Sequence, residues 1–191
     1  MTNPLVPLIA QGKADRAVLG ALARQQRWVI AADRRSFLHL AQRAADQPET
    51  AAFFALLAEG ETLAAGHLEA FAEACGDGAG EPLAGCQAYP AYVAWLALNG
   101  APGDVLVALT ANFAEWGGYC ATVARALRDH YGFTDEACAF FDFFAEPSPE
   151  LDRAAGAAAR AGRPDDALAR RYSRLLREYE GMFWRTLLEF A

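Results

Sequence analysis

Apolar residues recur at helical spacing along almost the whole chain, and the alternation typical of β-strands is absent. Alanine, the strongest helix former, is abundant. The clearest pattern lies near the C-terminus, where one helical stripe contains Leu168, Tyr172, Leu175, Leu176, Tyr179, Phe183 and Leu187. The sequence therefore predicts an all-α fold, in which several amphipathic helices bury their apolar faces in a bundle.

Glycine and proline divide the chain into eight predicted helices. They cover residues 4–11, 14–45, 49–76, 83–99, 103–131, 134–145, 149–161 and 165–190. Thr134 and Ser148 are predicted N-caps, and Pro90 is expected near the start of the fourth helix. No linker divides the 191 residues, so we expect a single helical domain over 1–191.

The charge balance limits the classes of partner. The formal net charge is −7 and Lys13 is the only lysine, so we expect no nucleic-acid binding. No apolar run of about 18 residues is present, and no signal peptide is expected, so we predict no membrane association. The four cysteines are widely separated, which is typical of buried thiols in a cytoplasmic protein.

Several polar residues fall on helix faces that are otherwise apolar. They are Gln26 and Asp33 in the second helix, Glu61 in the third, Asn112 in the fifth, and Glu180 at the edge of the C-terminal stripe. An unpaired buried polar group costs several kcal/mol, so these groups need partners or a ligand. Their convergence predicts a small closed pocket, with Tyr89, Trp116 and Phe140 as its aromatic wall.

Three stretches give the sequence a resemblance to the TenA (thiaminase II) family, within the heme-oxygenase-like helical bundles that include PqqC-like enzymes. They are Pro7-Leu8-Ile9 with Gln25-Gln26-Arg27-Trp28, then Tyr89-Pro90-Ala91-Tyr92 with the segment 109–116, and finally the segment 179–184. The resemblance implies a heme-oxygenase-like fold, a role in thiamine metabolism and assembly into a homodimer or tetramer. An exposed Trp184, which lies outside the main C-terminal stripe, is expected to support such assembly.

The chain also departs from the family pattern. Tyr89 and Glu180 match family site residues, but Gln26 stands where the family has an Asp, and Trp116 and Phe140 replace tyrosines. Asn112 occupies the position of the nucleophilic cysteine, and asparagine cannot act as a thiolate. The resemblance therefore implies no cysteine-dependent thiaminase activity, and Cys120, about two turns further on, is the natural substitute to test.

Each candidate also has a purely structural interpretation. Glu180 could pair with Arg177, one helical turn away, and Asp33 and Glu61 could be buried acids bound to neighbouring side chains. Asn112 and Gln26 could make interhelical hydrogen bonds, and Trp116 and Phe140 could belong to the core. These alternatives stay open at the level of sequence.

The leading hypothesis is a TenA-like protein that binds a small aromatic or heteroaromatic molecule in an internal pocket. Glu61 and Glu180 are the candidate catalytic residues, because desolvated carboxyls with a raised pKa can transfer protons. The predicted ligand-binding residues are Gln26, Asp33, Tyr89, Asn112, Trp116 and Phe140. A non-catalytic binding paralogue or regulator is one alternative, and a carboxylate-rich metal-dependent oxygenase is another. Because the segment 144–151 has no histidine, we expect no metal site, and we expect no cofactor.

Overall fold

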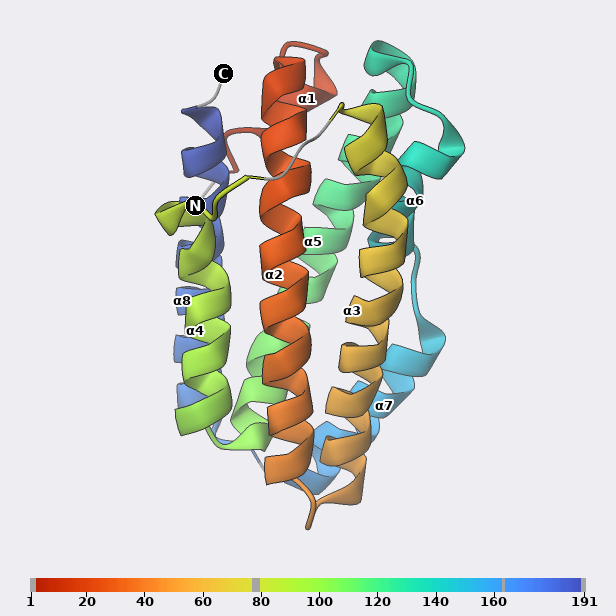
Figure 1. The fold of residues 1–191 in the computed structure, drawn as a ribbon. Helices are drawn as coiled ribbons and strands as arrows, with labels where there is room; N and C mark the ends of the chain where they lie inside the picture. The colour runs from red at the N-terminus through yellow and green to blue at the C-terminus, as the bar shows by residue number, and fades with distance from the viewer. Residues whose placement is uncertain (1–2, 77–79, 163, 190–191) are drawn as a thin grey trace.

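The computed structural model describes residues 3–76, 80–162 and 164–189, and in these ranges it contains helices and no strand. The helices are α1 (Val6–Ala10), α2 (Arg16–Arg43), α3 (Pro48–Ala74), α4 (Ala84–Asn99), α5 (Pro102–Tyr131), α6 (Asp135–Ala145), α7 (Pro149–Gly162) and α8 (Asp166–Leu188). They pack as a bundle (Figure 1), so the predicted all-α fold is confirmed.

Local side-chain chemistry sets several helix ends. Thr134 caps α6 by accepting a hydrogen bond from the amide of Ala137 at 3.2 Å, as the sequence predicts. Ser148 caps α7 in the same way, through the amide of Leu151. The fourth helix, predicted over 83–99, is α4, and Pro90 lies inside it, six residues after its first residue, rather than near its start. Leu83 stands at the N-cap position of α4 in an extended conformation, and its side chain makes no capping hydrogen bond.

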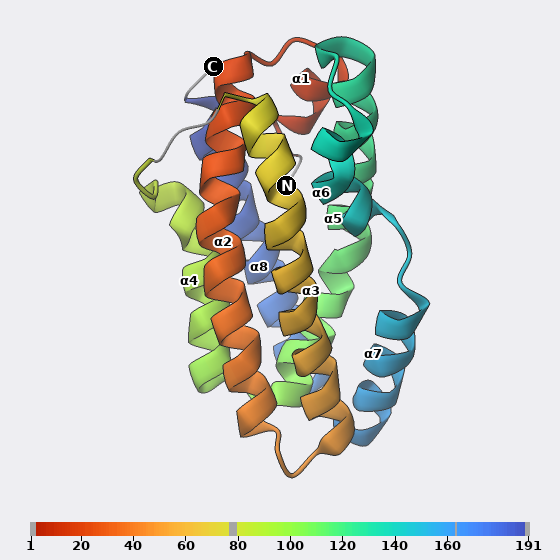
Figure 2. The ribbon, with the colours of Figure 1, turned by 45° about the vertical axis from the view of Figure 1, so that its right-hand side comes forward.

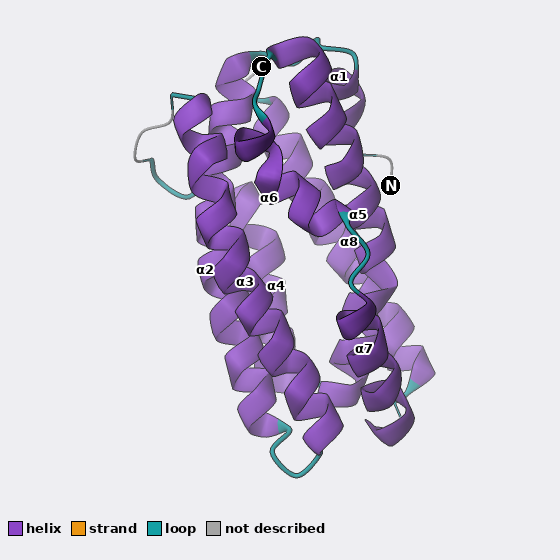
Figure 3. Ribbon diagram, turned by 90° about the vertical axis from the view of Figure 1, so that its right-hand side faces the viewer, coloured by secondary structure: helices purple, strands orange, loops and turns teal. Residues whose placement is uncertain are grey.

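The long helices form the body of the bundle, and two short ones cover one side of it. α4 lies at the outside, packed against α2 and α8 (Figures 1 and 2). α6 and α7 both lie between α3 and α5. They follow one another along the bundle axis, with α6 over one half and α7 over the other (Figure 3). No described helix is long and apolar enough to cross a membrane.

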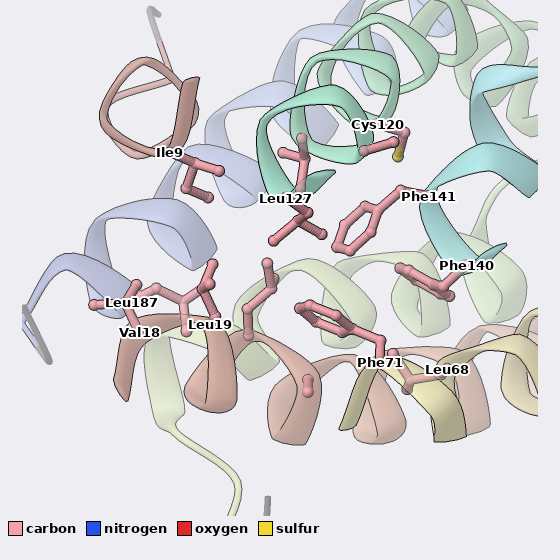
Figure 4. Close-up of a cluster of buried hydrophobic side chains, with 14 of the residues drawn as sticks. Ile9, Val18, Leu19, Leu68, Phe71, Cys120, Leu127, Phe140, Phe141 and Leu187 are labelled. Atoms are coloured by element: carbon pink, nitrogen blue, oxygen red, sulfur yellow. The ribbon is translucent and has the colours of Figure 1, made fainter. Parts of the chain in front are cut away.

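The buried apolar side chains form two separate clusters. The upper cluster lies under α1 and α6 (Figure 4) and includes Ile9, Val18, Leu19, Leu68, Phe71, Cys120, Leu127, Phe140, Phe141 and Leu187. The lower cluster lies under α7 and includes Phe37, Leu40, Phe53, Phe54, Val93, Leu96, Val105, Leu109 and Leu176. Each long helix contributes to both clusters, so each crosses a level at which the apolar core is interrupted.

Candidate functional site

A polar residue occupies the level between the two clusters on four of the long helices. On α2, Asp33 lies between Ile30 of the upper cluster and Phe37 of the lower one. On α3, Glu61 lies between Ala64 and Ala58 in the same way. On α4 the residue is Tyr89, which packs against both clusters, and on α8 it is Glu180, between Phe183 and Leu176. We call Asp33, Glu61, Tyr89 and Glu180 the polar layer.

Asp33 and Glu61 form the most unusual pair in the polar layer. Asp33 is only 4% exposed, and its Oδ1 has no hydrogen-bond partner in the structure. Burial, and then the charge of Glu61, raise the pKa of Asp33 well above its usual range. Burial raises the pKa of Glu61 to about 8. At neutral pH both groups therefore favour the protonated form, in which a carboxyl can donate as well as accept a hydrogen bond.

Tyr89 lies close enough to Asp33, Glu61 and Glu180 for all three carboxyls to influence its hydroxyl. Burial raises the pKa of the Tyr89 hydroxyl, and the charges of Asp33, Glu180 and Glu61 raise it further. The tyrosine therefore stays protonated and remains a hydrogen-bond donor beside three carboxyls. Burial also raises the pKa of Glu180, although a hydrogen bond from the Trp184 indole opposes this shift.

Aromatic rings surround Glu180. The Trp184 Nε1 donates to Glu180 Oε1 at 2.9 Å, and the Trp184 ring lies 6.1 Å from each of the Trp116 and Tyr119 rings. Trp184 is only 2% exposed, so the prediction that it forms an exposed partner surface is wrong. The indole can be buried because Glu180, one helical turn away, satisfies its N–H group.

The two predicted wall residues lie in different surroundings. Trp116 is half-buried and contacts Phe144 of α6 as well as Trp184 of α8. Phe140 has no exposed surface, and its ring packs against Phe141 and Phe144 in the upper cluster. Trp116 can therefore face a ligand, whereas Phe140 supports the ring of Phe144 from behind.

Asn112 is held by hydrogen bonds between α5 and α8. Its amide nitrogen donates to the Ala108 carbonyl at 2.7 Å and to Ser173 Oγ at 3.3 Å. Its oxygen accepts from Arg177, which also donates to Ser173. Of the two interpretations of Asn112, the interhelical hydrogen bond is therefore the one present. Since Arg177 is engaged here, Glu180 has Trp184 as its hydrogen-bond partner.

Gln26 lies away from the polar layer. Its side chain is 5% exposed on the inner face of α2, but it precedes Asp33 by about two helical turns, or roughly 10 Å along the axis. The neighbouring Gln25 has a clear structural role, since its amide binds the Glu81 carbonyl and the Leu83 amide just before α4. Sequence periodicity alone could not separate these two adjacent glutamines.

An open groove on the α2–α3 face leads to Glu61. The groove has a volume of about 490 Å³, and Ala31 and Ala65 leave space between the two helices. Arg34 donates to Thr62 across it at 2.9 Å. The sequence predicted a closed pocket, whereas this hollow is open to solvent. Glu61 lines the groove and also raises the pKa of Asp33, so it connects solvent with the polar layer.

Two further kinds of chemistry, nucleophilic attack by a cysteine and metal coordination, depend on the surroundings of Cys120 and on the placement of the acidic residues. Burial and the charge of Glu180 raise the pKa of the Cys120 thiol, which is 1% exposed, so it favours the un-ionised form that is a poor nucleophile. Within the described ranges, no group of three or more His, Cys, Asp or Glu side chains is placed to hold a metal ion.

Several contributors to the site were missed at the level of sequence. Tyr119 contacts Trp184, and its hydroxyl hydrogen-bonds to Glu115 at 2.6 Å. The charge of Glu115 in turn raises the pKa of Glu180. The four-residue spacing of Glu180 and Trp184 was the one available signal, because it places both on the same helix face.

No family model matches the chain, and no curated protein matches its sequence.

Proposed function

We propose that the polar layer is the binding site for a small heteroaromatic molecule, in a protein of the TenA type that works without a cysteine nucleophile. The observation that carries the proposal is the carboxyl of Asp33, which is buried and leaves Oδ1 without a hydrogen-bond partner. A buried polar atom of this kind costs about 1–3 kcal/mol, which a bound ligand would recover. The resemblance to TenA in the stretches around Tyr89 and Glu180 supports the same class of ligand.

The chemistry of the layer favours ligands that both donate and accept hydrogen bonds. A carboxyl with a raised pKa can donate its proton to a ring nitrogen and accept a hydrogen bond from an amino group on the adjacent carbon. Trp116 and Trp184 offer flat apolar surfaces near Glu180. An aminopyrimidine has both the hydrogen-bonding edge and the flat ring that this arrangement accommodates.

If the protein is an enzyme, its carboxyls carry the reaction. Glu61 is poised between its two protonation states near neutral pH, which suits a general acid or base. Glu180, held by Trp184, is a second proton-transfer group at the other side of Tyr89. Hydrolysis or proton transfer on a bound heterocycle fits these groups. A non-catalytic binding protein would use the same contacts and lack turnover.

Binding of 4-aminopyrimidine tests the proposed site. We expect isothermal titration to detect binding, and we expect Asp33→Leu to weaken it at least tenfold, because leucine can neither donate nor accept a hydrogen bond. Glu178→Gln, which changes an exposed acid on α8 paired with Arg174, is the matched control and should bind as the wild type does. Equal affinity for the wild type and Asp33→Leu, or no binding of any aminopyrimidine at millimolar concentration, would refute the proposed site.

Thiamin turnover provides a second test. We expect no release of the thiazole ring above background, because Asn112 occupies the nucleophile position and the Cys120 thiol is buried. The measurement is chromatographic detection of thiazole after prolonged incubation with the purified protein. Turnover that Cys120→Ser abolishes would show that a cysteine mechanism survives, and the proposed carboxyl chemistry would then be wrong.

A metal-dependent oxygenase is the weaker alternative. Asp33, Glu61 and Glu180 lie on three different helices around Tyr89, and the described residues offer no set of three ligands in coordinating positions. The protein purified from metal-supplemented medium should therefore contain less than one equivalent of iron or manganese by mass spectrometry. Stoichiometric metal that Glu61→Gln removes would favour the oxygenase instead.

A further inference from the structure

The charge of one hollow, between α5 and α8, is opposite to that of the whole chain. The two helices pack against each other along one side of the bundle (Figure 3). Of the described residues that line the hollow, three are arginines and none is acidic, although the chain has a formal net charge of −7. Arg170, Arg174 and Arg177 share one face of α8, at intervals of four and three residues. We call this hollow of about 300 Å³ the arginine pocket.

Arg177 is held at the arginine pocket by two uncharged side chains. Its Nη1 donates to Asn112 Oδ1 at 3.1 Å and to Ser173 Oγ at 2.9 Å. These two bonds use both hydrogens of Nη1, and within the described ranges Arg177 makes no other hydrogen bond and no ion pair. The Nε and Nη2 edge, with which a guanidinium can bind two oxygens at once, therefore stays available. The neutral partners fix the position of Arg177 and leave its charge uncompensated.

Ser173 supplies a further hydrogen-bond donor beside Arg177. Its side chain is only 5% exposed, and its Oγ accepts hydrogen bonds from Asn112 at 3.3 Å and from Arg177. A hydroxyl has two lone pairs and one proton, so with both lone pairs used it can only donate. No acceptor for this proton lies within hydrogen-bonding distance in the described part of the chain. An acceptor atom bound in the arginine pocket would take it.

The other two arginines add positive charge at the rim of the pocket. Arg170 and Arg174 are exposed and lie one helical turn apart, a spacing at which like charges repel. Arg174 pairs with Glu178 at 2.6 Å, whereas Arg170 forms no ion pair with a described residue. The carboxylate of Glu178 thus offsets one of the three charges. An anion bound between the guanidinium groups would relieve the repulsion that remains.

The number of donors indicates which anion fits best. A carboxylate has two oxygens and one charge, which Arg177 alone could satisfy. A phosphate monoester has three terminal oxygens and a charge of about −2 at neutral pH, so it can also use the Ser173 hydroxyl and the rim arginines. The opposite wall consists of Val107 and Ala111 of α5. These side chains offer no hydrogen bond, so they suit an apolar organic group on the ester oxygen.

We propose that the arginine pocket is a binding site for a small organic phosphate monoester, in which Arg177 and Ser173 donate to the phosphate oxygens and α5 contacts the organic group. A volume of about 300 Å³ is at the lower end for ligand pockets, so it fits a small molecule. The proposal is independent of the polar layer. Asn112 acts here through the two side chains that it holds, since it bonds to both Ser173 and Arg177.

Isothermal titration with three simple anions tests the choice of ligand. We expect phenyl phosphate to bind, and inorganic phosphate to bind about tenfold more weakly, because it places no apolar group against α5. Benzoate has the same ring with a single charge and should also bind more weakly. No binding of phenyl phosphate at 10 mM, or equal affinity for phenyl phosphate and either of the other two anions, would overturn the proposal.

Two neighbouring arginines give a matched pair of variants. Arg170→Gln removes one charge from the rim and should weaken the binding of phenyl phosphate about fivefold. Arg171→Gln makes the same change at an exposed arginine that does not line the pocket, and it should bind as the wild type does. Circular dichroism should show the same helix content in both variants. An equal loss of affinity in the two would mean that only the overall charge matters, and the site would be refuted.

The role of Arg177 is best tested without replacing it, because its hydrogen bonds also join α8 to α5. In ¹⁵N NMR spectra of the wild type, the Nε–H signal of Arg177 should shift as phenyl phosphate is added, whereas that of Arg171 should stay in place. 4-Aminopyrimidine, which has no phosphate, should not reverse the shift. An Arg177 signal that does not move at saturation, or one that 4-aminopyrimidine restores, would contradict a separate phosphate site.

Discussion

Glu61 combines two environments, since it lines a groove that is open to solvent and also belongs to the polar layer. Burial raises the pKa of its carboxyl to about 8, from an ordinary value near 4.5. Between these two values the folded protein holds a proton that the unfolded chain releases. Stability should therefore fall as pH rises through this window, by up to about 1.4 kcal/mol per pH unit for one such group.

The variant Glu61→Gln isolates this effect, because glutamine cannot ionise. We expect urea denaturation at pH 5.5, 7 and 8.5 to show that the variant gains stability relative to the wild type as pH rises, with no further gain above about pH 8. Some pH dependence should remain in the variant, because burial, the larger cause, still raises the pKa of Asp33 after the charge of Glu61 is removed. If the free energy of unfolding changes with pH by the same amount in the wild type and in Glu61→Gln, then Glu61 is not protonated in the folded protein.

At the scale of single residues, helical periodicity predicted which side chains face the interior better than it predicted their hydrogen-bond partners. Asp33 and Glu61 were placed on inner faces by periodicity, and both lie in the polar layer. Asn112 was equally well placed, yet its hydrogen bonds go to Ser173 and Arg177, more than 60 residues away along the chain. Such contacts depend on how α5 meets α8, which a single helical pattern does not contain.

At the scale of helices, the ion pairs of Arg128 fix α6 against α5. Arg128 Nε donates to Asp135 at 2.7 Å, and its two terminal nitrogens reach the two carboxylate oxygens of Asp142 at 3.2 and 2.6 Å. This paired geometry suits the planar guanidinium and cannot be reproduced by lysine. α6 carries the phenylalanines behind Trp116, so its position matters for the candidate site.

We therefore expect Arg128→Lys to destabilise the protein by about 1 kcal/mol, with little further loss when Asp142→Asn is added. Hydrogen exchange should increase in α6 before it increases in α2. The control is Arg174→Lys, whose partner Glu178 lies on the exposed face of the same helix, so that this ion pair should contribute less. Additive losses in the double variant would mean that the paired geometry adds nothing.

Helix positions were the most predictable part of the fold, because caps and breaks are local. Thr134 and Ser148 act as the caps that the sequence indicated, and Gly132 ends α5 with a φ of 70°, where a side chain would be strained. The bounds of α4 agree with the predicted helix over 83–99 to within one residue, and Pro90 lies inside this helix rather than near its start. The row of arginines on α8 could have been found in the sequence, but the pocket that they line depends on how α8 packs against α5.

At the scale of the whole molecule, the polar layer divides the apolar interior into two clusters. A single continuous core would bury more apolar surface with the same helices. Carboxyls that must be protonated to be buried reduce stability rather than add to it. A layer that persists at this cost is typical of a functional site, in which stability is sacrificed for the contacts a ligand needs.

Joining the two clusters should therefore make the protein more stable and abolish the proposed ligand binding. We expect the double variant Asp33→Leu with Glu61→Leu to unfold in guanidinium with a higher free energy, by about 1–4 kcal/mol, and to lose aminopyrimidine binding. Asp104→Leu is the matched control. Asp104 is also buried, but its Oδ1 accepts the Asp165 amide at 2.6 Å, so its replacement should destabilise the protein by about 1–3 kcal/mol. If the double variant is destabilised as Asp104→Leu is, Asp33 and Glu61 are structural acids whose partners hold the bundle together, and the polar layer is part of the scaffold.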